Sequence, residues 1–315
     1  MSMKITFPGA LTTVQDLGRF GSMRFGFPAS GAMDTDSARI ANLLADNDER
    51  EAVLEMTMLG IKASFDSDCV IVLTGADMTP EINGEPIPMY AALEVRAGDI
   101  LALSAAKSGL RCYMAVSGGF DIPSVMGSFS TNLKCAVGGF NGRALKAGDV
   151  LDFRTQQDTL FGISARRLEE DEIPRHDEFI RVVLGPQDDY FTDEGVSTFL
   201  SQVYTLSNAS DRMGVRLEGE SIQAKAKSDI ISDGIALGSV QIPASGKPII
   251  MMADRQTTGG YAKIATVISA DIPSLAQKKP GDSIRFKAVD IKQAQKIYIA
   301  HERWFRNFAV SLMRS

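Results

Sequence analysis

The residues from Ala253 to Tyr261, ADRQTTGGY, combine charged, amide and hydroxyl side chains with two glycines. They lie between two apolar runs, Pro248 to Met252 and Ala262 to Ala270, which are expected to be strands. A tight hairpin turn needs only two residues, typically Asn-Gly or Asp-Gly. The segment therefore carries more hydrogen-bonding chemistry than chain reversal requires, and it is a candidate wall of a ligand site.

Further clusters have the same mixed composition. Glycine lets backbone N–H groups approach a ligand, while Asp and Arg supply an acceptor and a planar fork of donors for amides, carboxylates and phosphates. Together the clusters predict a polar cleft. They are TTVQDLGRFG from Thr12 followed by GFPASGAMD from Gly26, then GSFSTNLK from Gly127, and SNASDRMG from Ser207.

Each cluster also has a purely structural interpretation, because short polar side chains satisfy backbone groups at turns and helix ends. On that interpretation the clusters would hold loops rather than ligands. The structural alternatives are a helix cap at Asp34, an Asx-type turn at Gln15-Asp16, a turn cap at Ser130-Thr131, a local ion pair at Asp211-Arg212, and strand-end hydroxyls at Thr257-Thr258.

The common enzyme signatures are absent from the sequence. It contains no phosphate-binding G-x-x-x-x-G-K-[ST] loop, no G-x-G-x-x-G after a strand, and no G-x-S-x-G elbow. The two histidines, His176 and His301, have no second ligand at a suitable spacing, so no metal site is expected. Cys112 lies in the alternating run LRCYMAV, which predicts a buried, inert thiol.

Composition indicates a globular chain that does not bind nucleic acid. The 315 residues carry 33 basic and 39 acidic side chains, and no Lys/Arg stripe occurs. The three widely spaced cysteines fit no disulfide framework, which favours a reducing cytoplasm. No signal-peptide core and no apolar run of about 18 residues is present, so no membrane association is expected.

Most of the chain consists of short β-rich runs separated by Gly, Pro, Asn and Asp. Val70 to Thr74, VIVLT, predicts a strand, and Asn83-Gly84 predicts a tight hairpin. A Gly-Asp turn precedes an alternating strand three times, which favours a barrel. The three copies are AGDILAL at Ala97, AGDVLDF at Ala147 and PGDSIRF at Pro280.

Three segments have helical periodicity: Asp34 to Ala45, Thr192 to Tyr204 and about Ile291 to Met313. The last mixes Gln and Lys with Trp and Phe, as expected for a helix on the surface of a domain or partner. Thr155 to Asp177 is charged, aperiodic and contains Pro174. It is the candidate linker between two lobes.

In this order the clusters resemble the allophanate hydrolase subunit 2 family, also called the biotin-dependent carboxyltransferase family. The resemblance covers nearly the whole chain. Phe129 departs from it, because many relatives have Arg there in a G-S-R-S-T run, and the ligand could differ accordingly. The matching motifs are TTVQDLGRFG, SGAMD, LTGA, GGFDIPSVMGSFST, GGFNGRALKAGD, LGPQDDYF, SDRMGVRL, VQIPASGKPIIMMADRQTTGGY and LAQKKPGD.

The resemblance implies a mainly β protein with a few helices, built of two cyclophilin-like β-barrel lobes. We place an N-terminal lobe at residues 1–165, a C-terminal lobe at 175–288 and a terminal helix at 289–315.

The resemblance also implies three candidate functions. The leading one is a subunit of an ATP-dependent 5-oxoprolinase complex, which is a lactam hydrolase. The expected partners are a subunit 1-family protein and a third subunit. ATP is a cofactor of the complex and need not contact this chain. The alternatives are the carboxyltransferase subunit of a biotin-dependent urea or amide carboxylase, and a non-catalytic partner that regulates a kinase-inhibitor-like subunit. Biotin is required only in the carboxylase, and the sequence lacks a biotinylation motif.

The predicted site residues follow from matching these motifs. Arg212 and Arg255 are expected to face an anion, and Asp211 and Asp254 to orient groups or accept an amide N–H. The expected substrate contacts are Gln256, Thr257, Thr258 and Tyr261, with Gln15, Asp16, Ser30 and Ser130 as further candidates.

Overall fold

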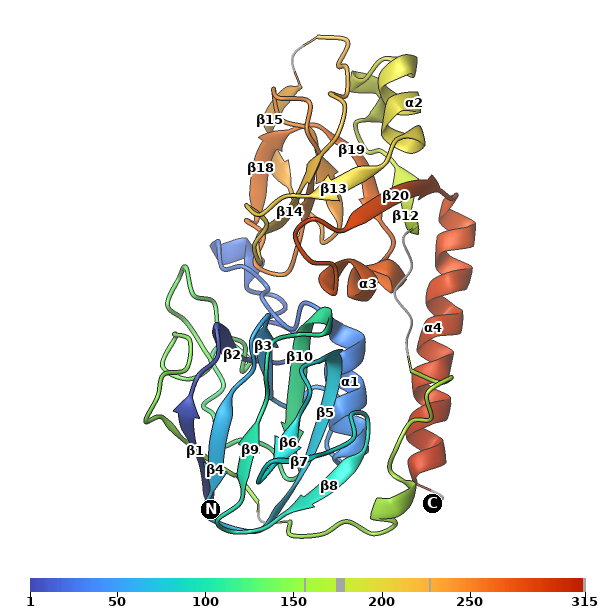
Figure 1. Cartoon of the computed structure of the whole chain (residues 1–315). Coiled ribbons are helices and arrows are strands. Elements are labelled where there is room, and N and C mark those ends of the chain that lie inside the picture. The colour runs from blue at the N-terminus through green and yellow to red at the C-terminus, as the bar shows by residue number, and fades with distance from the viewer. Residues whose placement is uncertain (156, 174–178, 227, 314–315) are drawn as a thin grey trace. The chain divides into compact units, whose positions relative to one another are not determined.

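The computed structural model describes residues 1–155, 157–173, 179–226 and 228–313 (Figure 1). These form two compact units. The first comprises residues 1–20, 30–173 and those from 307 onward, and the second comprises 21–29 and 179–306. His176 and the predicted start of the second lobe at residue 175 lie outside the described residues.

The first unit contains two antiparallel β-sheets around one apolar core. Their inward-facing residues include Met3, Leu54, Ile71 and Met114, all fully buried. One sheet has the order β11-β1-β4-β9-β6-β7 and the other β2-β3-β10-β5-β8. The strands are β1 Ser2–Phe7, β2 Leu11–Gln15, β3 Val53–Thr57, β4 Lys62–Phe65, β5 Cys69–Asp77, β6 Glu81–Ile82, β7 Glu85–Pro86, β8 Ala92–Val95, β9 Ile100–Ala102, β10 Ser108–Val116 and β11 Val150–Asp152.

Helix α1, Thr35–Leu44, packs against β3, β5 and β10 in this unit. Asp34 caps it, because its Oδ1 accepts from the Ser37 backbone N–H at 3.0 Å. The predicted helix and its cap are confirmed. The tight hairpin at Asn83-Gly84 is also confirmed: both residues have positive φ, as this turn requires.

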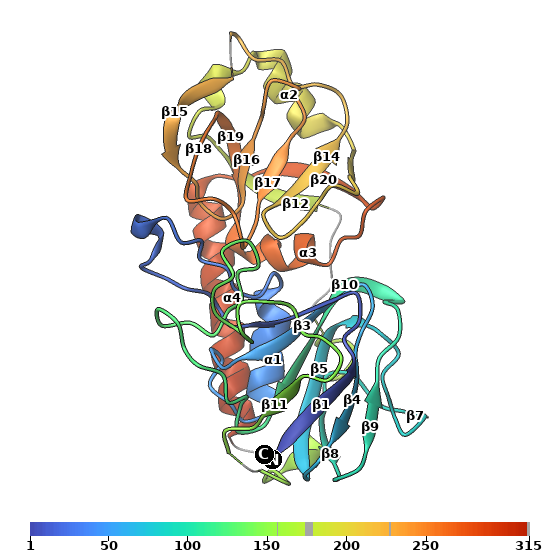
Figure 2. The ribbon, with the colours of Figure 1, turned by 90° about the vertical axis from the view of Figure 1, so that its left-hand side faces the viewer.

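The second unit is a closed seven-stranded barrel with a small additional sheet, and the mainly β fold class is confirmed (Figure 2). The barrel order is β12-β19-β16-β17-β14-β13-β20, and β15 pairs with β18. The strands are β12 Phe179–Leu184, β13 Tyr204–Leu206, β14 Gly214–Glu218, β15 Asp229–Gly234, β16 Ser239–Gln241, β17 Ile249–Met251, β18 Thr258–Tyr261, β19 Lys263–Val267 and β20 Ser283–Ala288.

The three Gly-Asp repeats fold into the same turn. Asp99, Asp149 and Asp282 each donate their backbone N–H to a carbonyl three residues earlier. Each carboxylate in turn accepts the N–H of that earlier residue, at 2.7 or 2.8 Å. The glycine before each Asp has a φ of 91–94°, which an L side chain rarely adopts. The sequence therefore predicted three turns that start β9, β11 and β20.

Two predicted segments differ from the structure. Helix α2 covers Asp193–Ser201 rather than reaching Tyr204. The chain becomes extended at Gln202, Tyr204 pairs with Ile284 in the barrel, and Val203 is 43% exposed rather than on a buried helical face. Likewise, Thr258–Tyr261 do not belong to the loop between strands, because they form β18.

Helices α3, Ile272–Ala276, and α4, Ile291–Leu312, complete the fold. The long terminal helix is thus confirmed. In the part of the chain that the structure describes, no helix is both long and apolar enough to cross a membrane.

Candidate functional site

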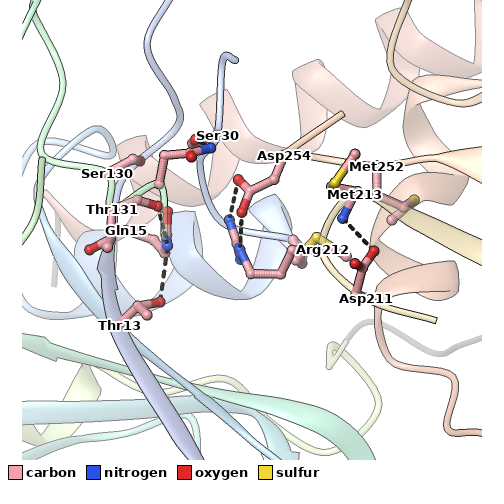
Figure 3. A network of polar contacts seen from close by, with 12 residues as sticks. Thr13, Gln15, Ser30, Ser130, Thr131, Asp211, Arg212, Met213, Met252 and Asp254 are labelled. Carbon is pink, nitrogen blue, oxygen red and sulfur yellow. Dashed lines mark hydrogen bonds and ion pairs between the residues drawn. The ribbon is translucent and has the colours of Figure 1, made fainter. Parts of the chain in front are cut away.

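Arg212 and Asp254 form a buried ion pair in the second unit (Figure 3). The guanidinium donates from Nε to Oδ2 at 2.9 Å and from Nη2 to Oδ1 at 3.2 Å. The two side chains are only 8% and 9% exposed. Bidentate, charge-assisted hydrogen bonds of this kind fix the relative orientation of the two side chains and also stabilise the pair. Arg212, which was predicted to face an anion, and Asp254, which was predicted to orient groups or accept an amide N–H, are therefore bonded to each other.

The backbone holds the two loops of this pair side by side. Met252 donates its N–H to the Met213 carbonyl, and Asp254 donates to the Arg212 carbonyl, both at 2.9 Å. These bonds continue the pairing of β14 with β17, in which Gly214 lies opposite Met251. The position of Arg212 thus follows from the barrel register.

Asp211 begins the turn that leads into β14. Its Oδ1 accepts the backbone N–H groups of Met213 at 2.9 Å and Gly214 at 3.0 Å. This is an Asx-type turn, which holds the carboxylate in one orientation. The second oxygen, Oδ2, has no hydrogen-bond partner among the described residues and remains able to accept a bond.

Arg255 is buried without a carboxylate partner. Its Nε donates to the Ile235 carbonyl at 3.0 Å and its Nη1 to the Met252 carbonyl at 3.3 Å. Among the described residues, none of the side-chain carboxylates lies within 4.0 Å of its guanidinium. Burial lowers the pKa of Arg255 from its ordinary value. A cation held only by carbonyl dipoles favours binding of an anion nearby.

A cavity of about 220 Å³ lies beside the Asp211 turn. Its volume is below the roughly 300–1,000 Å³ of pockets for drug-sized ligands, so it suits a smaller molecule. Both polar groups and apolar side chains contact it. The lining residues are Asp211, Met213, Gly214, Arg216, Gln241, Ile249, Met251, Gln256 and Tyr261.

In the first unit, Asp16 is the centre of a buried network. Its Oδ1 accepts from the Gly18 N–H at 2.7 Å, from the Ser128 hydroxyl at 2.8 Å, and from the Ser130 hydroxyl. Its Oδ2 accepts from the Phe129 N–H at 2.7 Å. The carboxylate is therefore occupied by groups of the protein itself, and it fixes the loop around Phe129.

Gln15 and Ser30 belong to the same unit. Gln15 Nε2 donates to Thr13 Oγ1 at 2.9 Å and to the Thr131 carbonyl at 3.2 Å (Figure 3). Its Oε1 is buried and has no hydrogen-bond partner among the described residues, which holds for no other acceptor in the predicted set. Ser30 accepts from Asn132 Nδ2 at 3.0 Å and has a φ of 56°.

The structure brings some predicted site residues together and separates others. Asp211, Gln256 and Tyr261 line one cavity, and Arg212 pairs with Asp254. Thr257 and Thr258 do not line that cavity, and Thr258 pairs with Gly234 at the start of β18. Gln15, Asp16, Ser30 and Ser130 form their own group in the first unit. The chemical roles assigned to these residues stay predictions.

Sequence reasoning missed three functional candidates. Gln241 and Arg216 line the cavity. The fully buried Arg19 donates to the carbonyls of Val125 and Ser130 at 2.9 and 2.8 Å. An amide within the apolar run SVQIP was the available signal for Gln241. The signal was weak, because only the strand register shows which face of the barrel that amide occupies.

Among the described residues, the structure has no group of three or more His, Cys, Asp or Glu side chains placed to hold a metal ion. The cavity offers one carboxylate oxygen of Asp211, amide and hydroxyl groups, and the guanidinium of Arg216. Arg255 does not line the cavity and directly precedes Gln256 in the chain. Such a set recognises a small molecule that has both N–H and oxygen groups.

Two proteins similar in sequence cover 90% and 98% of this chain. The chain is 40% identical over 289 residues to a 5-oxoprolinase subunit of Haemophilus influenzae, covering 90% of each chain. It is 37% identical to the equally named 5-oxoprolinase subunit of Escherichia coli, covering 98% of this chain and 97% of that one.

The structure of Kluyveromyces lactis urea carboxylase is also similar, with a TM-score of 0.90 and 30% identity. That match covers 98% of this chain but only 29% of the larger one. The family described as "Carboxyltransferase domain, subdomain A and B" matches residues 25–288. By these similarities of sequence and fold, the chain belongs to the carboxyltransferase-domain family.

Proposed function

We propose that the chain is a subunit of an ATP-dependent complex that hydrolyses 5-oxo-L-proline to L-glutamate. The observation that carries this proposal is the similarity to two proteins named as subunits of 5-oxoprolinase, which covers at least 90% of both partners in each comparison. The match to urea carboxylase instead covers a minor part of a much longer chain.

The chemistry of the reaction explains what the site must supply. A lactam carbonyl is unreactive toward water. Transfer of the γ-phosphoryl group of ATP to the lactam oxygen releases ADP and creates a leaving group. Water then adds to the activated carbon, and the C–N bond breaks as the ring nitrogen takes up a proton, which gives the amine and leaves an acyl phosphate. A second water molecule hydrolyses this acyl phosphate to the carboxylate of glutamate and free phosphate. Positioned cations and hydrogen-bond donors stabilise the charge that develops in such steps.

The residues of this chain have suitable properties for two of these tasks. Arg255 is a buried cation that has no carboxylate partner among the described residues, so it would stabilise a phosphoryl or oxyanion group. Asp211 has an oxygen that could accept the lactam N–H. The Arg212–Asp254 pair would hold the two loops that carry these groups in place.

The proposal includes partner subunits and a reducing compartment. The similar proteins are named as subunits, which supports assembly with partner chains. The proposal takes these partners to be a subunit 1-family protein and a third chain. All three cysteines are free thiols, as expected in the cytoplasm.

The test is to coexpress the chain with these companions and to measure glutamate formed from 5-oxoproline, with ATP and without it. We expect glutamate only when ATP and all subunits are present. Arg255→Ala should abolish most turnover, while Arg285→Ala, which changes an exposed arginine of β20, should not. A well-formed complex that makes no glutamate would contradict the proposal.

A second candidate function is biotin-dependent carboxyl transfer to urea or a related amide, which the likeness to urea carboxylase favours. A carboxylated biotin would supply the carboxyl group, and Asp211 and Gln241 could bind the N–H and carbonyl of its ureido ring. Copurification of a biotinylated protein, with bicarbonate-dependent carboxylation of urea, would favour this function. A tight complex that acts on none of these amides would favour a regulatory binding partner instead.

A further inference from the structure

The cavity beside Asp211 lies on the outer face of the barrel. Ile250 of β17 pairs with Val215 of β14 and with Val240 of β16, and all three side chains are buried. Side chains alternate between the two faces of a strand. Their neighbours Arg216, Ile249 and Gln241, which pair in the next row, therefore share the outer face, where the three line the cavity.

Gln241 is the unusual member of this row. Gln241 is only 2% exposed, and its side-chain Nε2 is buried with no hydrogen-bond partner among the described residues. A buried amide donor without a partner costs about 1–3 kcal/mol. Native proteins rarely keep such groups unless a ligand or water satisfies them.

Gly259 of β18 leaves room for this amide. A Cβ atom at position 259 would lie 3.1 Å from Gln241 Nε2 and 2.9 Å from Gln256 Nε2. Two amide groups therefore approach the same backbone position, and both side chains line the cavity. Glycine in a strand often marks such a close approach.

The other residues that line the cavity supply a hydrogen-bond acceptor, a cation and apolar surface. Asp211 Oδ2 is an acceptor without a partner among the described residues, since the Asx turn uses only Oδ1. Arg216 is exposed, and its guanidinium has no ion-pair partner among the residues that the structure describes. Met251 and Ile249 supply apolar surface to the same cavity.

We infer that this cavity binds a cyclic amide that carries a carboxylate. The ring C=O accepts from Gln241 Nε2, the ring N–H donates to Asp211 Oδ2, and the carboxylate pairs with Arg216. The apolar ring atoms pack on Met251 and Ile249. The inference rests on the proposed function only where it identifies this cyclic amide as 5-oxoproline.

The ureido ring of biotin shares the adjacent N–H and C=O groups of a lactam. The carboxylate distinguishes 5-oxoproline from biotin. In biotin the carboxylate lies at the end of a long chain, and it is converted to an amide when biotin is attached to a carrier protein. Arg216 thus favours a compact ligand in which the carboxylate is bonded to the ring.

Calorimetric titration of the full-length chain tests the inference, both alone and in the reconstituted complex. The probes are 5-oxo-L-proline, 2-pyrrolidone, which lacks the carboxylate, and biotin methyl ester. The key variants are Gln241→Leu and Arg216→Gln. Their matched controls are Gln223→Leu, an exposed glutamine outside the cavity, and Arg285→Gln.

We expect 5-oxoproline to bind more tightly than the other two probes. Gln241→Leu should weaken its binding about tenfold, as loss of a buried hydrogen bond predicts. The melting temperature of this variant should stay equal or rise, because an unsatisfied donor is removed. Arg216→Gln should lower affinity for 5-oxoproline but not for 2-pyrrolidone.

Three results would overturn the inference: no 5-oxoproline binding in either preparation, equal binding to Gln241→Leu, or preferential binding of biotin methyl ester. Glutamate formation is measured in parallel. A complex that makes glutamate with an unchanged KM in Gln241→Leu would refute this site and leave the proposed function standing. Lactam binding that depends on Gln241, in a complex that makes no glutamate, would support the site and refute the function.

Discussion

Arg212 and Asp254 are separated by 42 positions in the chain, yet their side chains meet in a two-pronged ion pair that is almost completely buried. The cost of removing two charges from water is offset only while both partners are present. The pair is therefore sensitive to the loss of either residue, although replacing both together can be tolerated.

The first prediction concerns the stability of this pair. Arg212→Met and Asp254→Leu should each lower the free energy of unfolding by about 3–5 kcal/mol, because each leaves a buried charge uncompensated. The double variant should lose much less than the sum of the two. Urea denaturation of the four proteins measures the coupling.

The exposed pair Lys247–Glu218 provides the control. Glu218→Gln should cost less than about 1 kcal/mol, as is usual for surface ion pairs. Additive losses at Arg212 and Asp254 would contradict the coupling, and would show that each residue stabilises the unit separately.

The second prediction compares two roles of Arg255: binding an anion, and stabilising the fold through its hydrogen bonds to two carbonyls. Arg255→Ala should lower turnover by about 10²–10³-fold, the usual effect of removing a donor that stabilises an oxyanion. Its stability should fall only by about 1–3 kcal/mol, because two carbonyls lose a donor. Inorganic phosphate should raise the melting temperature of the unmodified chain, and much less that of Arg255→Ala. Equal phosphate stabilisation of both proteins would rule out anion binding at this residue.

The third prediction treats Asp16 as a structural centre. Its carboxylate accepts bonds from Gly18, Ser128, Phe129 and Ser130, so Asp16→Asn should destabilise the first unit by at least about 2 kcal/mol. Asp48→Asn is the control, since among the described residues the exposed carboxylate of Asp48 accepts only the nearby Arg50 N–H. Thermal unfolding measures both. An Asp16→Asn protein as stable as the control, but inactive in the complex, would instead indicate a direct role in ligand binding.

Local patterns in the sequence predicted the local structures well. The Asp34 cap, the Asn83-Gly84 hairpin and the three Gly-Asp turns all depend on residues within a few positions of one another. Helix α2 was predicted too long because apolar spacing continued to Val203, whereas pairing of Tyr204 with β20 stops the helix earlier. Tertiary pairing therefore outweighed the helical periodicity.

The site was harder to predict because it depends on strand register. Gln241 reaches the cavity only because β16 pairs with β17 so that Gln241 lies opposite Ile249. A shift of one residue would turn its amide into the barrel interior. The Arg212–Asp254 pair similarly needs β14 beside β17. The spacing of residues along the chain does not show which strands pair or in which register. The family motifs could therefore indicate which segments form the site, but not which side chains contact each other.

The fourth prediction concerns pH. Hydrogen bonds from Arg143 lower the pKa of Asp149 below its usual 3.8, although burial opposes the shift. A carboxyl with a lowered pKa in the folded state stabilises the fold above its unfolded pKa, and that contribution disappears as pH falls through the folded value. The stability difference between the unmodified chain and Asp149→Asn should therefore decrease below about pH 4, from about 1 kcal/mol at neutral pH. A difference that does not change between pH 6 and pH 3 would contradict this role.

The fifth prediction concerns the three thiols, which differ in exposure. Cys135 is exposed, while Cys69 and Cys112 are buried in the core of the first unit. Burial raises the pKa of Cys69 to about 12 and that of Cys112 further above its ordinary value. Because the thiolate is the reactive form, only Cys135 should react quickly with an aromatic disulfide reagent at pH 8. Guanidinium should release all three thiols, and Cys135→Ser should abolish the fast reaction. A second fast thiol without denaturant would mean that the sheets around Cys69 and Cys112 open on the timescale of the reaction.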